Sequence, residues 1–167
     1  MAKNAIYSVK FRRRRLGLTN YTRRLALLKS GKPRLVVRLS NRYVLAQVVK
    51  SVDGHDSIIY SASSKELTKM GWKGSLKNLP SAYLTGLLVG KNCSVKELIL
   101  DCGVSKPSSR VFAVLKGCVD AGKSIPHSEK ALPIVERLEG NHINEKLSND
   151  LIKIKEKILK DGKKKTK

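Results

Sequence analysis

Acidic residues are scarce in this sequence, and the 13 Asp and Glu among its 167 residues are unevenly distributed. No acidic residue precedes Asp53, although the first 52 residues hold 14 Lys and Arg. Residues 151–167 carry a net charge of +6, and the stretch 53–150 between these ends is nearly balanced at +2. Fourteen cations without an anion repel one another unless a polyanion neutralises them. The distribution therefore indicates a polyanionic partner, and nucleic acid is the first candidate.

Long apolar runs and clustered metal ligands are also missing. No run reaches the roughly 18 apolar residues that span a bilayer, and no apolar stretch of signal-peptide length precedes the first arginines. We therefore expect a soluble protein that is not secreted. The three cysteines, Cys93, Cys102 and Cys118, lie in apolar surroundings without the spacing of a zinc motif, so we expect reduced packing residues. The histidines are equally scattered, and we expect neither a metal nor a cofactor.

Residues 1–17 are predicted to form a basic arm that binds RNA. Arg12–Arg15 is a run of arginine, with Phe11 beside it. Guanidinium groups bind phosphates through two hydrogen bonds and stack on bases, and aromatic rings offer further stacking surfaces. A nuclear-import-like basic stretch is the competing interpretation, whereas a membrane-binding amphipathic pattern is absent. The lysine tail, 163–167, fits two interpretations: it binds the polyanionic partner, or it is only a solvated, disordered end.

The order of predicted elements indicates an α/β fold in which helices pack on a mixed sheet. Helices are expected over 20–30, 64–70, 79–91, 109–121 and 144–160, and strands over 34–39, 43–49, 57–62 and 95–101. The first three strands should form an antiparallel meander. We divide the chain into the arm at 1–17, an α/β RNA-binding domain at 18–143, and a C-terminal helix with a lysine tail at 144–167.

The enzyme class has little support. Asp101 follows a predicted strand, where catalytic carboxylates often lie, but the other acidic residues do not converge on it as a two-metal nuclease requires. Its side chain more plausibly caps the following turn. Trp72 and Lys73 lie between glycines in a short loop, where the indole could stack on a nucleotide or could fill the core.

Several stretches together resemble a known family. They are KFRRRRLGLTNYTRRLALLKSGKPRLVVRLSNRYVLAQVV (10–49), LPSAYLTGLLVGK (79–91), LILDCGVSKPSSRVFAVLKGCVDAG (98–122) and IPHSEKALPIVERLEGNHI (125–143). They closely resemble the large-subunit ribosomal protein family that binds 5S ribosomal RNA, number eighteen in the universal naming, in its archaeal form. The helix after Asn144 matches this family least clearly.

The resemblance implies a ribonuclease H-like fold without catalysis, in a protein of the cytoplasmic ribosome that attaches 5S ribosomal RNA to the large subunit at the central protuberance. Its partners would be 5S RNA, large-subunit RNA and neighbouring ribosomal proteins, with no membrane. The RNA contacts expected from the resemblance and from the residues themselves are Phe11, Arg12, Arg13, Arg14, Arg15, Arg23, Arg24, Lys32, Arg34, Arg38, Ser40, Asn41, Arg42, Tyr43, Trp72 and Lys73. A chromatin-like DNA-binding protein and a metal-dependent nuclease are the two competing interpretations.

Overall fold

Four strands form one mixed sheet in the order β3-β2-β1-β4 in the computed structural model, which describes residues 8–104, 108–143 and 145–161. The strands are β1 (Arg34–Leu39), β2 (Val44–Val52), β3 (His55–Ser63) and β4 (Ile99–Asp101). The first three are antiparallel neighbours and β4 pairs parallel with β1, so the predicted meander and mixed sheet are confirmed. Part of the predicted arm (1–7) and the lysine tail (163–167) lie outside the described residues.

The turn between β2 and β3 follows from the residues that form it. Asp53 and Gly54 both have positive φ, at 49° and 80°, which is the conformation that a tight turn between twisted strands requires.

The strand predicted over 95–101 is shorter than expected, since only its last three residues join β1. The residues before them pair instead with the segment at Ser124, through a parallel bridge at Glu97.

Two apolar helices cover one face of the sheet. They are α4 (Leu79–Asn92), which is buried from Pro80 to Gly90, and α5 (Ser109–Asp120). The helices touch backbone to backbone at Gly86 and Gly117, where an added Cβ would overlap the Val114 and Tyr83 carbonyl oxygens. Both helices confirm the predictions made from their apolar periodicity.

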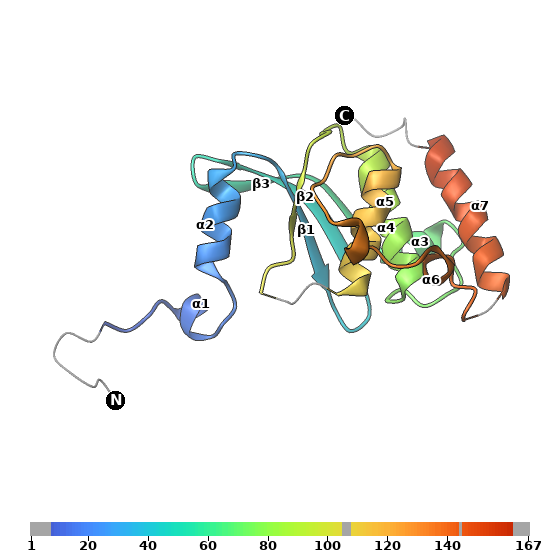
Figure 1. Cartoon of the computed structure of the whole chain (residues 1–167), viewed down its shortest axis with the longest axis horizontal. Helices are drawn as coiled ribbons and strands as arrows, with labels where there is room; N and C mark the ends of the chain where they lie inside the picture. Colours follow the sequence, from blue (N-terminus) through green and yellow to red (C-terminus); the bar gives the residue numbers. More distant parts are fainter. Residues whose placement is uncertain (1–7, 105–107, 144, 162–167) are drawn as a thin grey trace.

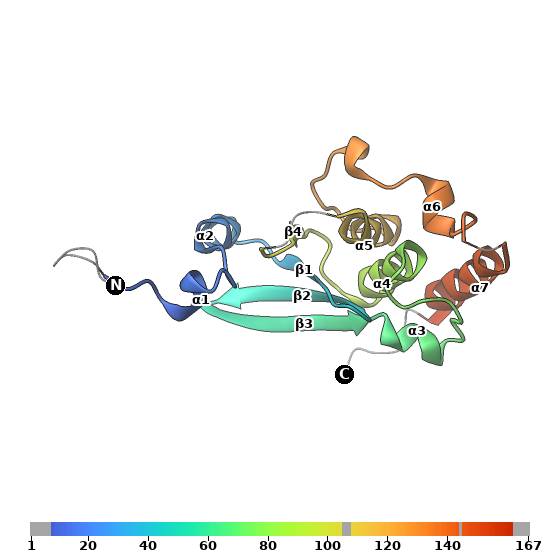
Figure 2. The same cartoon turned by 90° about the horizontal axis from the view of Figure 1, so that it is seen from below.

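Four further elements lie outside α4 and α5, and the three α-helices among them contact α4. These are α3 (Lys65–Lys69), the single-turn η1 (Glu129–Ala131), α6 (Val135–Glu139) and α7 (Glu145–Asp161). The amphipathic α7 buries Leu151, Ile154 and Ile158 in the core, which confirms the predicted last helix and its apolar stripe. Figure 2 shows α3 and α7 together at one end of the molecule.

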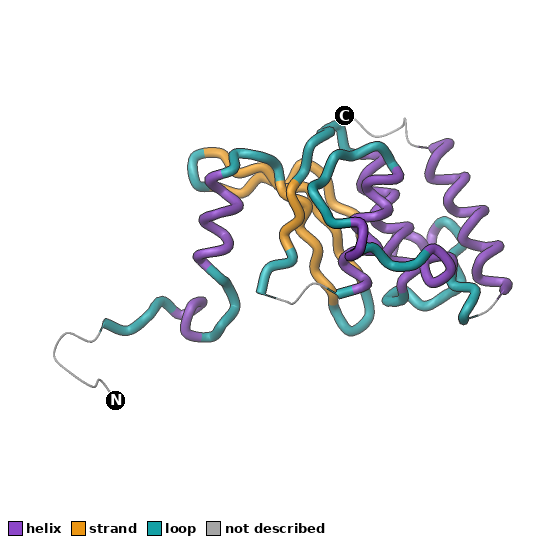
Figure 3. The backbone as a smooth tube through the Cα atoms, in the orientation of Figure 1, coloured by secondary structure: helices purple, strands orange, loops and turns teal. Residues whose placement is uncertain are grey.

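Two basic helices lie at the other end, on the opposite side of the sheet from α4 and α5 (Figures 1 and 3). They are α1 (Arg12–Arg15), a single turn that the sequence did not predict, and α2 (Tyr21–Lys29). Asn20 caps α2 by accepting a hydrogen bond from the Arg23 amide. Neither helix buries any residue, so polar contacts must carry much of their attachment.

The expectations about cysteine and about long apolar runs can be compared with the structure. Cys93, Cys102 and Cys118 are free thiols in the core, as predicted. Burial raises the pKa of the Cys118 thiol to about 12, which keeps it protonated and unreactive at neutral pH. Among the described residues, no helix combines the length and the hydrophobicity needed to cross a membrane.

Candidate nucleic-acid interface

The side chains of β1 divide between the two faces of the sheet. Leu35 and Val37 point into the core under α4 and α5. Arg34 and Arg38 alternate with them and therefore point to the opposite face, where Asp101 of β4 lies beside them in register. The same face receives α2, so the basic helix and the basic strand share one side of the molecule.

Arg34 lies at the centre of an ion-pair network on this face, with its side chain only 2% exposed. Its two terminal nitrogens donate to different carboxylates, at 3.1 Å to Asp101 and at 2.6 Å to Asp56. A buried guanidinium is tolerated only when its charge is paired in this way. Arg34 is therefore an internal structural residue, and its guanidinium, which was expected to contact RNA, is enclosed in this structure.

Asp56 joins the sheet to α2, because its second oxygen accepts a hydrogen bond from Arg24 at 2.8 Å. Burial by itself would raise the pKa of the Asp56 carboxyl, but hydrogen bonds and charge from Arg24 and Arg34 outweigh it and hold the pKa below 3.8. The carboxylate is thus ionised at neutral pH and fixes the direction of Arg24, whose side chain is 36% exposed.

Asp101 organises the other end of the network. One carboxylate oxygen accepts the Gly103 amide at 2.7 Å, so the predicted role of Asp101 in capping the next turn is confirmed. Arg38 donates to the Asp101 backbone carbonyl at 2.9 Å, and Arg23 of α2 donates to the Gly103 carbonyl at 3.1 Å. The turn after β4 therefore holds two of the predicted RNA-binding arginines in place.

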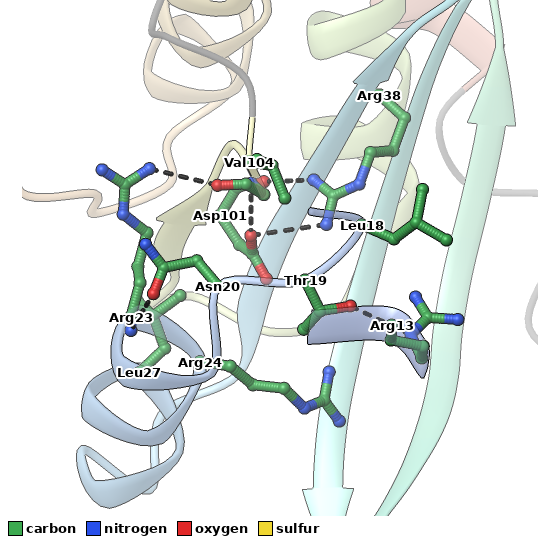
Figure 4. A pocket seen from close by; sticks show the side chains of 11 residues that line it. Arg13, Leu18, Thr19, Asn20, Arg23, Arg24, Leu27, Arg38, Asp101 and Val104 are labelled. Carbon is green, nitrogen blue, oxygen red and sulfur yellow. Dashed lines mark hydrogen bonds and ion pairs between the residues drawn. The ribbon is translucent and has the colours of Figure 1, made fainter. Parts of the chain in front are cut away.

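These contacts frame a pocket of about 150 Å³ between the arm, α2, β1 and the turn after β4 (Figure 4). Arg13, Arg23, Arg24 and Arg38 all line it, against the single carboxylate of Asp101. Arg13 is held at its rim by a hydrogen bond from its Nε to the Thr19 hydroxyl at 3.0 Å. Four guanidinium groups around one cavity make an anion site, since planar guanidinium donors match the geometry of phosphate.

The remaining arm residues project into solvent. Phe11 is 83% exposed, and Arg12, Arg14 and Arg15 are exposed on α1. No hydrogen bond from these three arginine side chains occurs within the described part of the chain. Their donors and the Phe11 ring are accessible to a partner.

The predicted contacts in the turn between β1 and β2 have two different positions: one closes the turn and two lie exposed at its tip. The Ser40 hydroxyl accepts the Tyr43 amide at 2.8 Å and donates to the Tyr43 carbonyl at 3.0 Å, so it holds the turn closed. Asn41 and Arg42 are exposed at its tip. Lys77 and Arg110, which were not predicted, join Asn41 around a shallow neighbouring pocket.

Three other predicted contacts, Trp72, Lys73 and Lys32, do not line the arginine pocket. Trp72 is 3% exposed and donates from Nε1 to the Ser75 carbonyl at 3.3 Å, so the indole fills the core, which was one of its two expected positions. Lys73 beside it is exposed, but it lies next to α3 rather than near the arm. Lys32 is exposed and pairs with Glu97 at 2.9 Å.

The carboxylates do not form a metal-dependent active site in the described ranges, where no three Asp, Glu, His or Cys side chains gather. Asp101 is engaged by two arginines and a backbone amide. Glu97 is paired with Lys32, which lowers the pKa of Glu97 by hydrogen bonding and by charge.

Sequence reasoning missed the function of Asp56 and the pocket-lining Thr19. Asp56 was not among the residues expected at this surface. The alternation of side chains along β1, β2 and β3, taken with the hairpin register, would have placed an acid of β3 on the same face as the basic side chains of β1, across β2. The contribution of Thr19 depends on the course of the arm, for which the sequence carries no comparable signal.

The sequence is similar to a family of ribosomal proteins. A family model described as "Ribosomal large subunit proteins 60S L5, and 50S L18" matches residues 5–98. The chain is 51% identical over 148 residues to a large ribosomal subunit protein uL18 of Korarchaeum cryptofilum, covering 86% of this chain and 76% of that protein. It is 50% identical over 149 residues to the uL18 of Caldivirga maquilingensis, covering 86% and 72% of the two chains. It is 51% identical over 148 residues to the uL18 of Methanococcus maripaludis, covering 86% and 77%.

The match covers most of the arm, α2, the three antiparallel strands and α4, and it includes the four arginines of the pocket, whereas Asp101, Gly103 and Val104 of the pocket lie beyond it. The identity to the relatives extends over most of the remaining chain, and their shared name describes structural proteins and not enzymes. The chain therefore belongs to the family of ribosomal large-subunit proteins 60S L5 and 50S L18, as an archaeal-type member, and is a structural constituent of the large subunit of the cytoplasmic ribosome.

Proposed function

We propose that this protein binds 5S ribosomal RNA through its arm, α2 and the β1–β2 turn, and attaches that RNA to the large subunit at the central protuberance. The observation that carries the proposal is the arginine-lined pocket of Figure 4, which lies beside an arm of four exposed arginines. A large-subunit ribosomal protein has RNA as its polyanionic neighbour, and this face is where the donors concentrate.

The proposed contacts fall into two groups with different tasks. Phe11, the arginines of α1 and the pocket arginines contribute phosphate binding and stacking, which supply affinity. Asn41, Arg42 and Tyr43 at the turn read the shape of the RNA, together with Lys32. The network around Arg34 holds Arg24 and Arg38 in fixed directions before RNA arrives, which reduces the entropy lost on binding.

The proposed division of the chain follows from these tasks. The arm (1–17) and the α/β domain (18–143) together form the 5S surface, while the C-terminal helix and lysine tail (144–167) lie outside it. A nuclease would need a carboxylate cluster, which the described residues do not form. A DNA-binding chromatin protein would bind duplex DNA as well as RNA, and a binding comparison separates it from the proposed function.

Binding to 5S ribosomal RNA, compared with an unrelated RNA of equal length, tests the proposal. Changing Arg12, Arg13, Arg14 and Arg15 together to Ala should weaken binding to 5S RNA by at least tenfold and leave the thermal midpoint nearly unchanged, because α1 buries no residue. The matched control changes Lys91, Lys96, Lys116 and Lys130 to Ala, which removes the same charge from the body and should have a much smaller effect.

Equal affinity for the two RNAs, or for duplex DNA, would contradict the proposal. A collapse of folding in the arm variant would show that the arm is structural. Large subunits assembled with the arm variant should also lose 5S RNA during purification, whereas a loss confined to other proteins would argue against the central protuberance.

A further inference from the structure

A second group of cations lies at the far end of the molecule from the arm. Lys65 and Lys69 are four residues apart on α3 and therefore share a face of that helix, and Lys73 follows in the next loop. On α7, Lys153, Lys157 and Lys160 follow one another at spacings of four and three residues and form a single stripe. All six side chains are exposed, and we refer to them as the α3–α7 lysine face.

Two contacts show that the stripe on α7 lies directly beside the end of α3. Lys157 Nζ donates to the Met70 carbonyl, the residue after α3, at 3.2 Å. Leu147, near the start of α7, packs so closely on Gly74 that a Cβ at this glycine would come within 2.6 Å of its methyl group. Because Leu151, Ile154 and Ile158 are buried below, the stripe is held in one orientation.

The acidic side chains in this region do not cancel the six lysines. Glu66 accepts the Ser63 amide at 2.9 Å and so serves as a cap for α3. Glu156 lies 3.9 Å from Lys160, and Asp150 is half-buried. The sequence continues beyond α7 with four more lysines between 163 and 167. The local charge is strongly positive, and the acidic side chains beside the six lysines leave most of it uncompensated.

We infer that the α3–α7 lysine face binds the phosphate backbone of a second RNA segment, distinct from the RNA held by the arm. The inference goes beyond the proposed function, which concerns the opposite end of the molecule, and it does not depend on the identity of that first RNA. Figures 1 and 2 show the arm and α2 at one end and α3 and α7 at the other, with the sheet and α4 between them.

The composition of the face favours RNA backbone over an acidic protein. A protein partner would need apolar anchors at the centre of the contact. The exposed apolar residues of α7, Ile152 and Leu159, are seven residues apart and lie along a different line of the helix from the lysines. Trp72, which precedes Lys73 in the chain, is buried and offers no ring to a partner. Lysine without aromatics or arginine binds phosphate as a point charge and reads no base.

The test uses the full-length protein in complex with 5S ribosomal RNA and a labelled 20-base-pair RNA duplex as the second ligand. The variant K69Q/K73Q/K153Q removes three charges from the face, and K91Q/K96Q/K130Q removes three exposed charges elsewhere. The wild-type complex and the control should bind the duplex equally. The face variant should bind about tenfold more weakly, with a salt slope lower by about 2 to 3. Lys69, Lys73 and Lys153 should become protected from acetylation only when the duplex is added.

Equal duplex binding by the two triple variants would overturn the inference, as would protection of these lysines by 5S RNA alone. Tighter binding of poly-glutamate than of the duplex to the face, at equal charge concentration, would also overturn it, in favour of an acidic protein partner. If the wild-type protein fails to bind 5S RNA, the proposed function fails separately. The duplex experiment is then repeated on the protein with Arg12–Arg15 changed to Gln, whose remaining binding must still depend on the face.

Discussion

Single arginines in this protein have distinct tasks that depend on their burial. Arg34 is enclosed and neutralised by Asp56 and Asp101, whereas Arg24 and Arg38 share those same carboxylates and remain partly exposed. Each of these two carboxylates therefore orients a partly exposed arginine and also compensates the charge of the buried Arg34. A substitution at either acid affects folding and the RNA-facing surface together.

The ion pair at Asp56 predicts a specific pH dependence of stability. The folded pKa of Asp56 lies below 3.8, so its ionised form stabilises the fold above about pH 4, and the contribution disappears as pH falls through the lowered pKa. Asp56→Asn should lower the free energy of unfolding by about 1 kcal/mol at pH 7, a value reduced by the 31% exposure of the side chain. Urea titrations at pH 7 and pH 3 measure the difference, which should shrink at pH 3.

Asp53→Asn is the matched control, because Asp53 lies in the same hairpin and Asn tolerates its positive φ. It should leave stability at pH 7 unchanged. A difference between wild type and Asp56→Asn that persisted undiminished at pH 3 would show that the carboxylate acts by packing and not by charge.

Trp72 is the single tryptophan of the chain, so its fluorescence reports on one site. Because the indole is buried and donates to the Ser75 carbonyl, its emission should be blue-shifted and weakly quenched by acrylamide. Addition of 5S RNA should change neither property. Strong quenching by RNA would mean that the indole stacks on a base, as the sequence had allowed.

Helix α2 is an element attached to the fold mainly by charge. It buries no residue, and its tertiary hydrogen bonds come from Arg23 to the turn after β4 and from Arg24 to β3. Its Tyr21 and Leu25 side chains are exposed and accessible to a partner. The helix at the RNA-facing surface is thus less firmly held than the helices of the core.

The pair formed by α4 and α5 is held in the opposite way, by close backbone contact. Gly86→Ala should destabilise the protein by about 2 kcal/mol or more, because the new methyl group would overlap the Val114 carbonyl oxygen. This loss exceeds the gain of roughly 0.5–1 kcal/mol that Ala normally brings to a helix. Thermal and urea unfolding measure the effect.

Lys91→Ala, at an exposed position of the same helix, should change stability by less than about 0.5 kcal/mol. If Gly86→Ala proved as stable as wild type, α4 and α5 could separate without cost, and the backbone contact between them would not determine their spacing.

The whole molecule has a nearly neutral body between two cationic ends. This arrangement predicts strongly salt-dependent RNA binding, with log K for 5S RNA falling by about 4 to 6 per tenfold rise in salt if six to eight phosphates are contacted. Neutralising Arg12–Arg15 should reduce that slope by about 3. Filter binding across a salt series measures both slopes, and a complex insensitive to salt would rule out phosphate contacts as the source of affinity.

Local sequence patterns were sufficient for the elements and for the partner class. Helix α2 with its Asn20 cap, the β1–β2 hairpin and the apolar α4 depend on nearby residues, and the acid-free first 52 residues indicate a polyanion whatever the fold. The shortening of β4 was not predictable, because pairing of residues 96–98 with Ser124 is a long-range choice between two possible neighbours.

Folding, in turn, decided which charged and aromatic side chains are available. Arg34 and Arg38 look equivalent along β1, yet two carboxylates distant in sequence enclose the first and leave the second partly exposed. Trp72 lies between exposed neighbours and is nevertheless buried, because α7 closes over the loop through Leu147. Burial depends on which segments meet in space, and no local pattern of residues encodes it. Charge and helical or strand periodicity are local properties, so the chain alone shows them.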